Sequence, residues 1–376
     1  IRREKATSNI CTAQSLLAII SSFYAIYHGY EGLNNIAKNI VILRCYLEQG
    51  LHKLGFIFNQ NVRFDSLNIY SAKSVAIHKS AIENGFNLRI LPLGADIDNS
   101  TGFGISLDEL SDINEVHKIL NFIAGVIDKK IDFEEIATDN LLNLNGIPLR
   151  EKKFLQQNVF KDYRSETDLM RYIFSLAEKD FSLVDGMIPL GSCTMKLNAA
   201  AELNPISWKN FSSIHPFVPQ SQIIGYEKII CDLESWISEI VGLDAVSFQP
   251  NAGSQGEFAG LLAIKSYFLS KNDFSRKKCL IPKSAHGTNP ASAVMAGFEI
   301  VQIACDYQGN VDLDDLSQKI KDCGTQIGAL MLTYPSTHGV FEINIKKICD
   351  LVHSVGALVY LDGANLNAQV GLCKPG

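Results

Sequence analysis

The sequence predicts an α/β protein with a mainly parallel sheet, preceded by a smaller α+β unit. From residue 221 onward, short apolar runs alternate with longer amphipathic stretches, which is the pattern of a parallel sheet with helices on both faces. Residues 66–126 mix strand and helix patterns without this alternation. The chain also has 376 residues, more than one ordinary hydrophobic core supports. We therefore expect at least two domains.

The first part of the chain is predicted to be helical and then mixed. An apolar helix is expected over 12–28, with Thr12 as its N-cap and Gly29 as its end, and a second helix over 33–54. The next expected elements are strands over 66–71, 87–93 and 103–107, and helices over 72–84 and 111–126. Periodicity weakens between 128 and 221, where one polar helix is expected over 166–178.

The last part of the chain opens with an amphipathic helix that ends at Gly242. The strands expected after it cover 245–249, 278–281, 299–304, 328–333 and 357–362, and the helices between them cover 253–269, 290–296, 313–322 and 343–354. Ligands bind at the carboxyl ends of the strands in such sheets. We therefore expect the functional residues in the loops that follow these strands.

Composition argues against several classes of function. The net charge is −6 with both signs interspersed, whereas a nucleic-acid surface is usually basic. The longest apolar run, 16–27, is shorter than the roughly 20 residues that cross a bilayer. The nine cysteines are scattered without CxxC pairs, which favours a reducing compartment and argues against a metal site. We therefore expect no nucleic acid, membrane or metal partner.

The turn Asn251–Glu257 follows an expected strand and opens an expected helix. Small residues let backbone N–H groups approach an anion, and the positive end of the helix dipole favours negative charge there. A phosphate fits this turn. A tight strand-to-helix turn without a ligand fits the same residues equally well.

His286 follows another expected strand, and Asp362 ends a further one. The imidazole can stack on a flat heterocycle or move a proton, or it can simply bond to its own loop. Thr288 and Asn289 are expected to cap the next helix. The carboxylate can cap a turn, or it can pair with a cation such as a protonated pyridine nitrogen. A phosphate turn, a histidine loop and a strand-end aspartate, in that order, are typical of an α/β enzyme that holds pyridoxal 5′-phosphate (PLP).

Further candidates surround this set. Ser336 and Thr337 follow another expected strand, where their hydroxyls can bind a ligand or complete a turn on Pro335. Ala364 leaves flat space beside Asp362. Lys374 is the one lysine after Asp362, but it lies in an expected loop and is poorly placed to tether a cofactor. Lys196, Lys265 and Lys283 are no better placed by their pattern.

Several long motifs together resemble the glycine decarboxylase (P-protein) family of the glycine cleavage system. These motifs are Glu4–Gln14, Pro189–Lys196, Gln249–Glu257, Ala285–Ser292, Tyr334–Gly339 and Asp362–Asn365. They run through the chain from one end to the other. The resemblance implies a PLP enzyme of the aspartate aminotransferase-like fold (fold type I), built from two similar halves.

The resemblance also implies a domain layout. Residues 1–35 would be a remnant of the large domain of the first half, and 36–150 its α+β small domain. Residues 151–220 would be the connector and N-terminal arm of the second half, and 221–376 its truncated PLP-binding large domain. The lysine that tethers PLP in the family would lie beyond Gly376, so we expect this chain alone to be inactive.

The resemblance assigns roles to residues at matching positions. Ala252, Gly253, Ser254 and Gln255 would hold the phosphate. His286 would stack on the ring, Asp362 would meet the ring nitrogen beside Ala364, and Ser336 or Thr337 would lie at the cofactor edge. Ser192, Cys193 and Thr194 would line a substrate channel.

The implied reaction is decarboxylation of glycine, with transfer of the aminomethyl group to the lipoyl arm of the carrier H-protein. The implied assembly is a dimer of two-half units, cytoplasmic in a bacterium and mitochondrial in a eukaryote. Two alternatives stay open. One is another fold-type-I PLP lyase or a cysteine desulfurase-like enzyme, and the other is a non-catalytic binding scaffold.

Overall fold

The computed structural model describes residues 15–58, 63–136, 150, 152–182, 185–186 and 199–376. The chain divides into two compact units, one over Ile19–Lys179 and one that takes in Asp180–Gly376. Ser192, Cys193, Thr194 and the motif Glu4–Gln14 lie outside the described residues.

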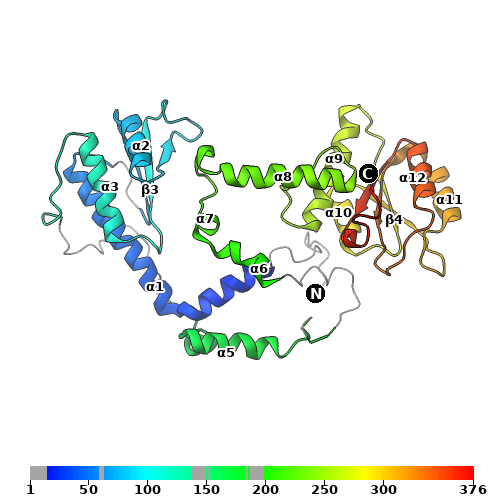
Figure 1. The fold of residues 1–376 in the computed structure, drawn as a ribbon, viewed down its shortest axis with the longest axis horizontal. Coiled ribbons are helices and arrows are strands. Elements are labelled where there is room, and N and C mark those ends of the chain that lie inside the picture. The colour runs from blue at the N-terminus through cyan, green and yellow to red at the C-terminus, as the bar shows by residue number, and fades with distance from the viewer. Residues whose placement is uncertain (1–14, 59–62, 137–149, 151, 183–184, 187–198) are drawn as a thin grey trace. The chain divides into compact units, whose positions relative to one another are not determined.

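The first unit is an α+β fold around a small antiparallel sheet (Figure 1). Its elements are α1 (Ser15–Lys53), β1 (Ser66–Tyr70), α2 (Ser74–Glu83), β2 (Arg89–Leu91), β3 (Gly102–Ser106), α3 (Ile113–Val126), α4 (Val159–Asp162) and α5 (Glu166–Ala177). The sheet order is β1-β3-β2, with both pairings antiparallel. Leu47 of α1, Leu67 of β1, Ile77 of α2 and Leu120 of α3 are fully buried in one core. The expected strands and helices of this region are confirmed.

The two helices expected before this sheet form one kinked helix. Gly29 has φ 55° and ψ −169° inside α1, so the backbone leaves the helical conformation there and then resumes it. A positive φ of this size suits glycine, which has no Cβ. An added Cβ would also overlap the carbonyl oxygen of Phe160. The prediction that Gly29 ends a helix is therefore correct locally, but the chain continues in a second helical segment without a loop.

The second unit contains the predicted parallel sheet. Its helices before the sheet are α6 (Ala200–Leu203), η2 (Asn204–Ser207), α7 (Lys209–Ser212), η3 (Gln220–Gln222) and α8 (Ile224–Val241). The alternating elements are α9 (Gly253–Ser270), β4 (Lys278–Pro282), α10 (Thr288–Met295), β5 (Glu299–Ile303), α11 (Leu313–Cys323), η4 (Gly324–Gln326), β6 (Ile327–Thr333), α12 (Ile345–Ser354), β7 (Leu358–Asp362) and η5 (Leu366–Ala368). The strand order is β5-β4-β6-β7, and every pairing is parallel.

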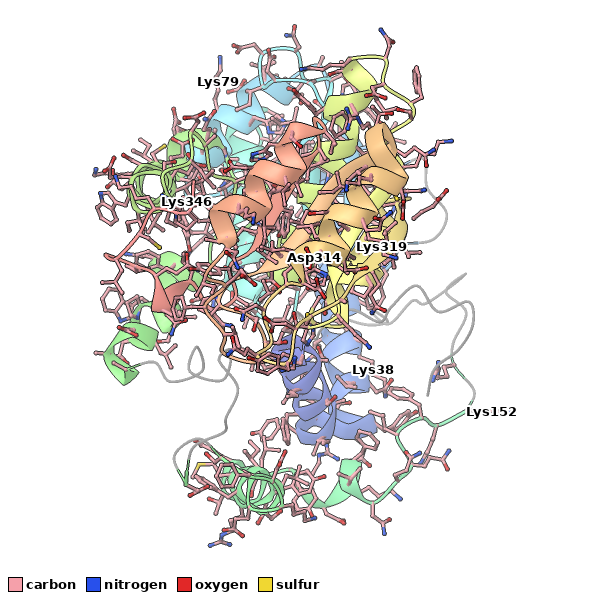
Figure 2. All side chains as sticks on the ribbon, turned by 90° about the vertical axis from the view of Figure 1, so that its right-hand side faces the viewer. Lys38, Lys79, Lys152, Asp314, Lys319 and Lys346 are labelled. Carbon is pink, nitrogen blue, oxygen red and sulfur yellow. The ribbon has the colours of Figure 1, made fainter. Side chains whose placement is uncertain are left out.

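Helices cover both faces of this sheet (Figure 1). Successive strand residues point to opposite faces, so Leu280 of β4 packs in the core under α11 and α12. Its neighbours Cys279 and Ile281 pack in the core under α9 and α10. The outer faces of α11 and α12 carry exposed charged residues such as Asp314 and Lys346 (Figure 2). The predicted α/β class, with a parallel sheet between two layers of helices, is confirmed.

Two features of the second unit differ from expectation. The strand expected over 245–249 is wrong, because these residues pair with no strand among those described. Alternating apolar residues give the segment a strand pattern, but a strand also needs a hydrogen-bonded neighbour. Helix α8 forms as expected, yet its apolar face is largely exposed. The exposed residues are Ile224, Ile229, Ile230, Leu233, Trp236 and Ile240.

Of the helices in the described ranges, none combines the length and the apolar character that a bilayer crossing requires. Those ranges also contain no cluster of three or more His, Cys, Asp or Glu side chains that could hold a metal ion.

Arg276 ties together the amino-terminal edge of the parallel sheet. Its Nη1 donates to the carbonyl oxygens of Ile327 at 2.8 Å and Val355 at 2.7 Å. Its Nε donates to Asp273 Oδ2 at 2.9 Å, and its guanidinium lies 5.1 Å from the ring centre of Phe268. The side chain is only 11% exposed. One guanidinium therefore binds backbone acceptors at the start of β6 and just after α12.

We expect Arg276→Met to lower the free energy of unfolding by about 2–4 kcal/mol, because it removes two charge-assisted hydrogen bonds to backbone carbonyl oxygens and the ion pair with Asp273. Urea denaturation followed by circular dichroism measures this change. The neighbouring exposed residue gives a matched control, since Lys277→Met removes the same charge and should change stability by less than about 0.5 kcal/mol. Equal losses in the two variants would contradict the role of Arg276.

Candidate functional site

The carboxylate of Asp362 lies at the carboxyl end of β7, opposite Thr333 at the end of β6. Its Oδ2 accepts hydrogen bonds from Thr333 Oγ1 at 3.1 Å and from Asn289 Nδ2 at 3.3 Å. Its Oδ1 accepts from the backbone N–H of Ala364 at 3.1 Å. These donors are all neutral, so they fix the orientation of the carboxylate without cancelling its charge. Such a carboxylate suits a cationic group.

Thr333 and Asn289 were not among the residues predicted to act here. Both side chains are almost fully buried, and Thr333 Oγ1 also lies 3.4 Å from Asn289 Oδ1. The sequence suggested that Asn289 caps the helix after β4, but α10 begins without any side-chain cap. The amide instead reaches across to β7. In the sequence, Thr333 is a polar residue at the end of an apolar strand and Asn289 a polar residue at the start of a helix. Neither position indicates which groups the side chain bonds to.

The turn Asn251–Glu257 forms the amino terminus of α9. Ala252 is extended and precedes the first helical residue, Gly253, and the first turn holds no acidic residue. A Cβ added at Gly253 or Gly256 would meet nothing within 4 Å, so the space around the first turn is open. The first N–H groups of a helix have no partners within the helix. This end of α9 can therefore accept an anion.

Two of the predicted phosphate residues bond to each other. Ser254 Oγ donates to Gln255 Oε1 at 2.9 Å, and Ser254 is buried while Gln255 is half-buried. Their backbone N–H groups lie in the first turn of α9, as the prediction requires.

His286 is exposed in the loop after β4. Its Nδ1 accepts the backbone N–H of Thr288 at 3.2 Å and lies 2.9 Å from Thr288 Oγ1. Because Nδ1 acts as an acceptor, the neutral imidazole carries its proton on Nε2. The orientation of the ring is thus fixed by contacts within its own loop, before any ligand binds.

The loop after β6 is tied to the other loops at this edge. Ser336 Oγ accepts hydrogen bonds from the backbone N–H groups of His338 at 3.2 Å and Val340 at 3.3 Å. These bonds agree with the alternative prediction that Ser336 completes a turn. Thr337 Oγ1 donates to the carbonyl oxygen of Ser284 in the loop after β4. Ala364 is exposed beside Asp362. The structure therefore gives Thr337 a contact between loops and leaves Ala364 open to a ligand.

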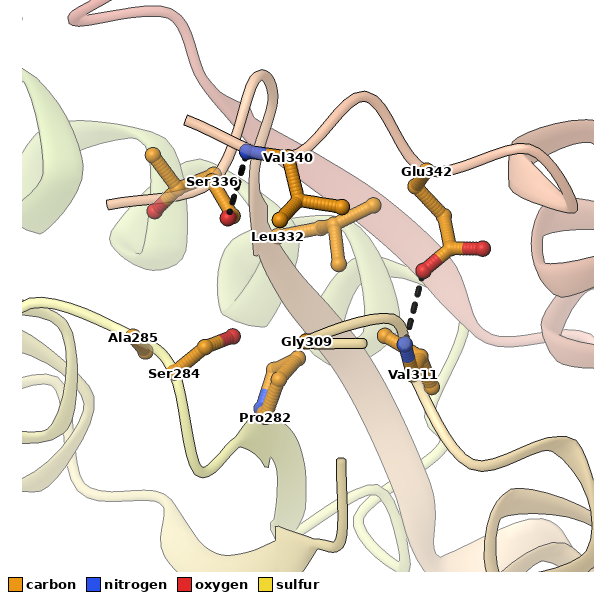
Figure 3. A pocket seen from close by; sticks show the side chains of 10 residues that line it. Pro282, Ser284, Ala285, Gly309, Val311, Leu332, Ser336, Val340 and Glu342 are labelled. Carbon is orange, nitrogen blue, oxygen red and sulfur yellow. Dashed lines mark hydrogen bonds between the residues drawn. The ribbon is translucent and has the colours of Figure 1, made fainter. Parts of the chain in front are cut away.

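A small hollow lies at the carboxyl ends of β4 and β6 (Figure 3). Ser284, Ser336 and Val340 form part of its wall, and Glu342 Oε2 accepts the backbone N–H of Val311 at 2.7 Å at its far side. The room for the centre of a water molecule is about 10 Å³, close to the minimum for one water. This hollow can hold a bridging water but not a cofactor.

The lysines considered for a cofactor tether are engaged elsewhere. Lys374 Nζ forms an ion pair with Glu239 of α8, which lowers the pKa of that carboxyl. Lys265 Nζ donates to the carbonyl oxygen of Ala296 at 2.8 Å. Neither amine bonds to Asp362 or to the residues that donate hydrogen bonds to it, Thr333, Asn289 and Ala364.

Glu257 is a second carboxyl in this region that the sequence interpretation left without a role. It lies in the second turn of α9 and is only 7% exposed. Burial, together with the charge of Asp362, raises the pKa of Glu257 to about 7, while the Asn289 and Ser292 side chains offset part of this rise. Gly260, one turn later, lies against the ring of Tyr360, and a Cβ there would overlap that ring. This close packing holds the start of α9 against β7.

The comparisons with known proteins agree with the family resemblance. A family model described as "Glycine cleavage system P-protein" matches residues 1–123. Over its whole length the chain is 59% identical to a glycine dehydrogenase (decarboxylating) from Prochlorococcus marinus and 49% identical to one from Synechocystis. The chain spans 39% and 38% of the lengths of these two relatives. The predicted resemblance to glycine decarboxylase is confirmed.

The structure also aligns with a crystal structure of glycine decarboxylase (P-protein) in an inhibitor-bound form. That alignment has a TM-score of 0.43 and 13% sequence identity, and it covers 67% of this chain and 52% of the other. A TM-score of this size does not establish a common fold. The α/β assignment rests on the strands and helices of this chain.

We expect the stability of the protein to fall as pH rises from 5 to 8, through ionisation of Glu257. Its pKa in the folded state is about 7, above the usual value of 4.5, so its stabilising contribution is complete below 4.5 and is lost as pH rises through 7. Between pH 5 and 8, the free energy of unfolding of the wild type should fall by roughly 2–3 kcal/mol relative to that of Glu257→Gln. Urea denaturation at several pH values measures the difference, and a constant difference would refute it.

Proposed function

We propose that this chain, which resembles glycine decarboxylase over its whole length, forms part of a PLP enzyme that decarboxylates glycine. In this proposal the aminomethyl group that remains passes to the lipoyl arm of a carrier H-protein. The names of the relatives, glycine dehydrogenase (decarboxylating), support the reaction. Their cyanobacterial origin supports a location in the bacterial cytoplasm. The second unit would supply the large domain that binds PLP, in an aspartate aminotransferase-like arrangement.

The residues at the carboxyl edge of the sheet fit PLP. Asp362 offers an oriented carboxylate to the ring nitrogen, and the open amino terminus of α9 offers N–H groups to the phosphate. His286 offers a ring held by its own loop. When bound, PLP would supply an electron sink for the charge left on the carbon of glycine as CO₂ departs.

The single observation that carries this proposal is the set of neutral donors around Asp362. An arginine or lysine bonded to this carboxylate would cancel the charge that a protonated ring nitrogen needs. Thr333, Asn289 and the N–H of Ala364 instead hold both oxygens in place and leave the charge available. The role of Asp362 would then be to keep the ring nitrogen protonated while electrons move into the ring.

The domain layout and the channel belong to the same proposal. Residues 1–35 and 36–150 would come from a first, cofactor-free half, and 151–220 would be the arm of the second half. Ser192, Cys193 and Thr194 on this arm would line the path of the lipoyl group.

We expect Asp362→Asn to weaken PLP binding at least about tenfold, because the isosteric amide has no charge to pair with the ring nitrogen. The dissociation constant can be measured by quenching of the fluorescence of Trp208 and Trp236. Asp350→Asn is the matched control, since Asp350 is exposed on α12 and its loss should leave binding unchanged. Wild-type affinity in Asp362→Asn would refute the proposed site.

We expect PLP to bind this chain without a covalent link to Lys374, because that amine is paired with Glu239. Borohydride reduction followed by peptide mass spectrometry should find no pyridoxyl group on Lys374, and no absorption band of a lysine imine should appear. A stoichiometric adduct at Lys374 would contradict this expectation. Bovine serum albumin, whose surface lysines react with PLP nonspecifically, serves as the positive control for trapping.

A further inference from the structure

A buried carboxyl lies behind Asp362 and has no part in the function proposed above. Glu257 extends from the second turn of α9, and its Oε2 is buried without a hydrogen-bond partner among the described residues. The Oγ of Ser292, on α10, is buried in the same way. A carboxylate in such a position has a large desolvation cost. The proton and charge of Glu257 therefore need an explanation.

The groups that face Glu257 do not supply a positive charge. From α10 come Asn289 and Ser292, which are neutral, and from β7 come Asp362 and Tyr360. Burial first, and then the charges of Glu257 and Asp362, raise the pKa of Tyr360, so the phenol stays neutral. The titratable groups that act on Glu257 are therefore another acid and a neutral phenol. A buried Glu257 and a half-buried Asp362 that lack a counterion repel each other when both are ionised, so one of them retains a proton more readily.

Hydrogen bonding decides which carboxyl holds that proton. Asp362 accepts three hydrogen bonds, from Thr333, Asn289 and the N–H of Ala364, and each of them stabilises its ionised form. Glu257 Oε2 is buried without a hydrogen bond in the described structure, and the nearby Asn289 and Ser292 side chains offset only part of the cost of burying its charge. The ionised form is therefore favoured at Asp362 and the protonated form at Glu257.

We propose that Glu257 and Asp362 form one two-carboxyl unit, in which a single proton resides on Glu257 and is released around neutral pH. Glu257 is a positioning residue, because it acts on a ligand only through Asp362. A cation that pairs with Asp362 offsets the charge beside Glu257, so Glu257 then releases its proton to solvent more readily. By linkage, ionisation of Glu257 strengthens the binding of that cation by the same factor. This last step rests on the proposed PLP site.

The first test uses the chain without cofactor. Infrared difference spectra should show the carbonyl stretch of a protonated, buried carboxylic acid that disappears with a midpoint near pH 7. The band should be absent in Glu257→Gln. In Asp362→Asn, which removes the neighbouring charge, the midpoint should fall by at least about one pH unit. Glu299→Gln is the matched control, because Glu299 is exposed at the start of β5 and its loss should leave the band unchanged.

The two-carboxyl unit is overturned if the band titrates at the usual carboxyl value, or if Asp362→Asn leaves its midpoint unchanged. Both substitutions are isosteric, and circular dichroism establishes that each variant is folded before its spectrum is compared.

The second test measures the dissociation constant of PLP between pH 6 and 8 in the wild type and in Glu257→Gln. The titration of PLP itself is common to both proteins, so their ratio isolates Glu257. The wild type should gain roughly fivefold in affinity relative to the variant between pH 6 and 8, if binding lowers the pKa of Glu257 by about one unit. A ratio of the two dissociation constants that does not change with pH would contradict the proposed coupling between Glu257 and Asp362. If PLP does not bind while Asp362→Asn still moves the infrared midpoint, the proposed function fails and the two-carboxyl unit stands.

Discussion

The pairing of β6 with β7 is the constraint on which the candidate site depends. Their parallel register places Thr333 directly opposite Asp362, so the last residues of two strands meet at one edge of the sheet. The hydrogen bond from Thr333 to Asp362 is a consequence of this register, and Asn289 reaches the same carboxylate from α10. A slip of one residue would turn the Asp362 side chain to the opposite face. The two cores on either side of the sheet prevent that slip, because each strand residue is matched to one of them.

Much of this architecture could be predicted because it follows from local patterns. The alternation of apolar runs and amphipathic stretches identified β4 to β7 and the helices between them to within a few residues. The same reasoning failed at 245–249, since a strand is defined by its hydrogen-bonded neighbours and not by its own residues. Gly29 shows a related limit of prediction. A glycine indicates where a helix is interrupted, as the positive φ of Gly29 confirms, but it does not indicate whether a loop or a second helical segment follows.

The site was predicted in part for a similar reason. Asp362 and His286 were predictable because one ends a strand and the other follows one, and the start of α9 was predictable because its small residues are typical of an anion-binding turn. Asn289 was interpreted as a helix cap, since an asparagine near a helix start usually bonds locally, whereas here its amide bonds to a strand that lies 73 residues later in the chain. In the sequence, Glu257 was identified only as the last residue of the motif Gln249–Glu257, with no role of its own. Its unusual protonation arises from burial and from the nearness of Asp362, and neither can be derived from residue order.

The close packing of Gly260 in α9 against Tyr360 in β7 sets the distance between this helix and this strand. Since residue 260 has no side chain, the ring of Tyr360 fits directly against the backbone of α9, two turns after its amino terminus. The separation between helix and strand is therefore set by the thickness of one aromatic ring. That separation also determines how far the positive end of α9 lies from the negative charge of Asp362. A ligand that bridged the two would have to match this spacing, so the glycine at position 260 would limit the length of such a molecule.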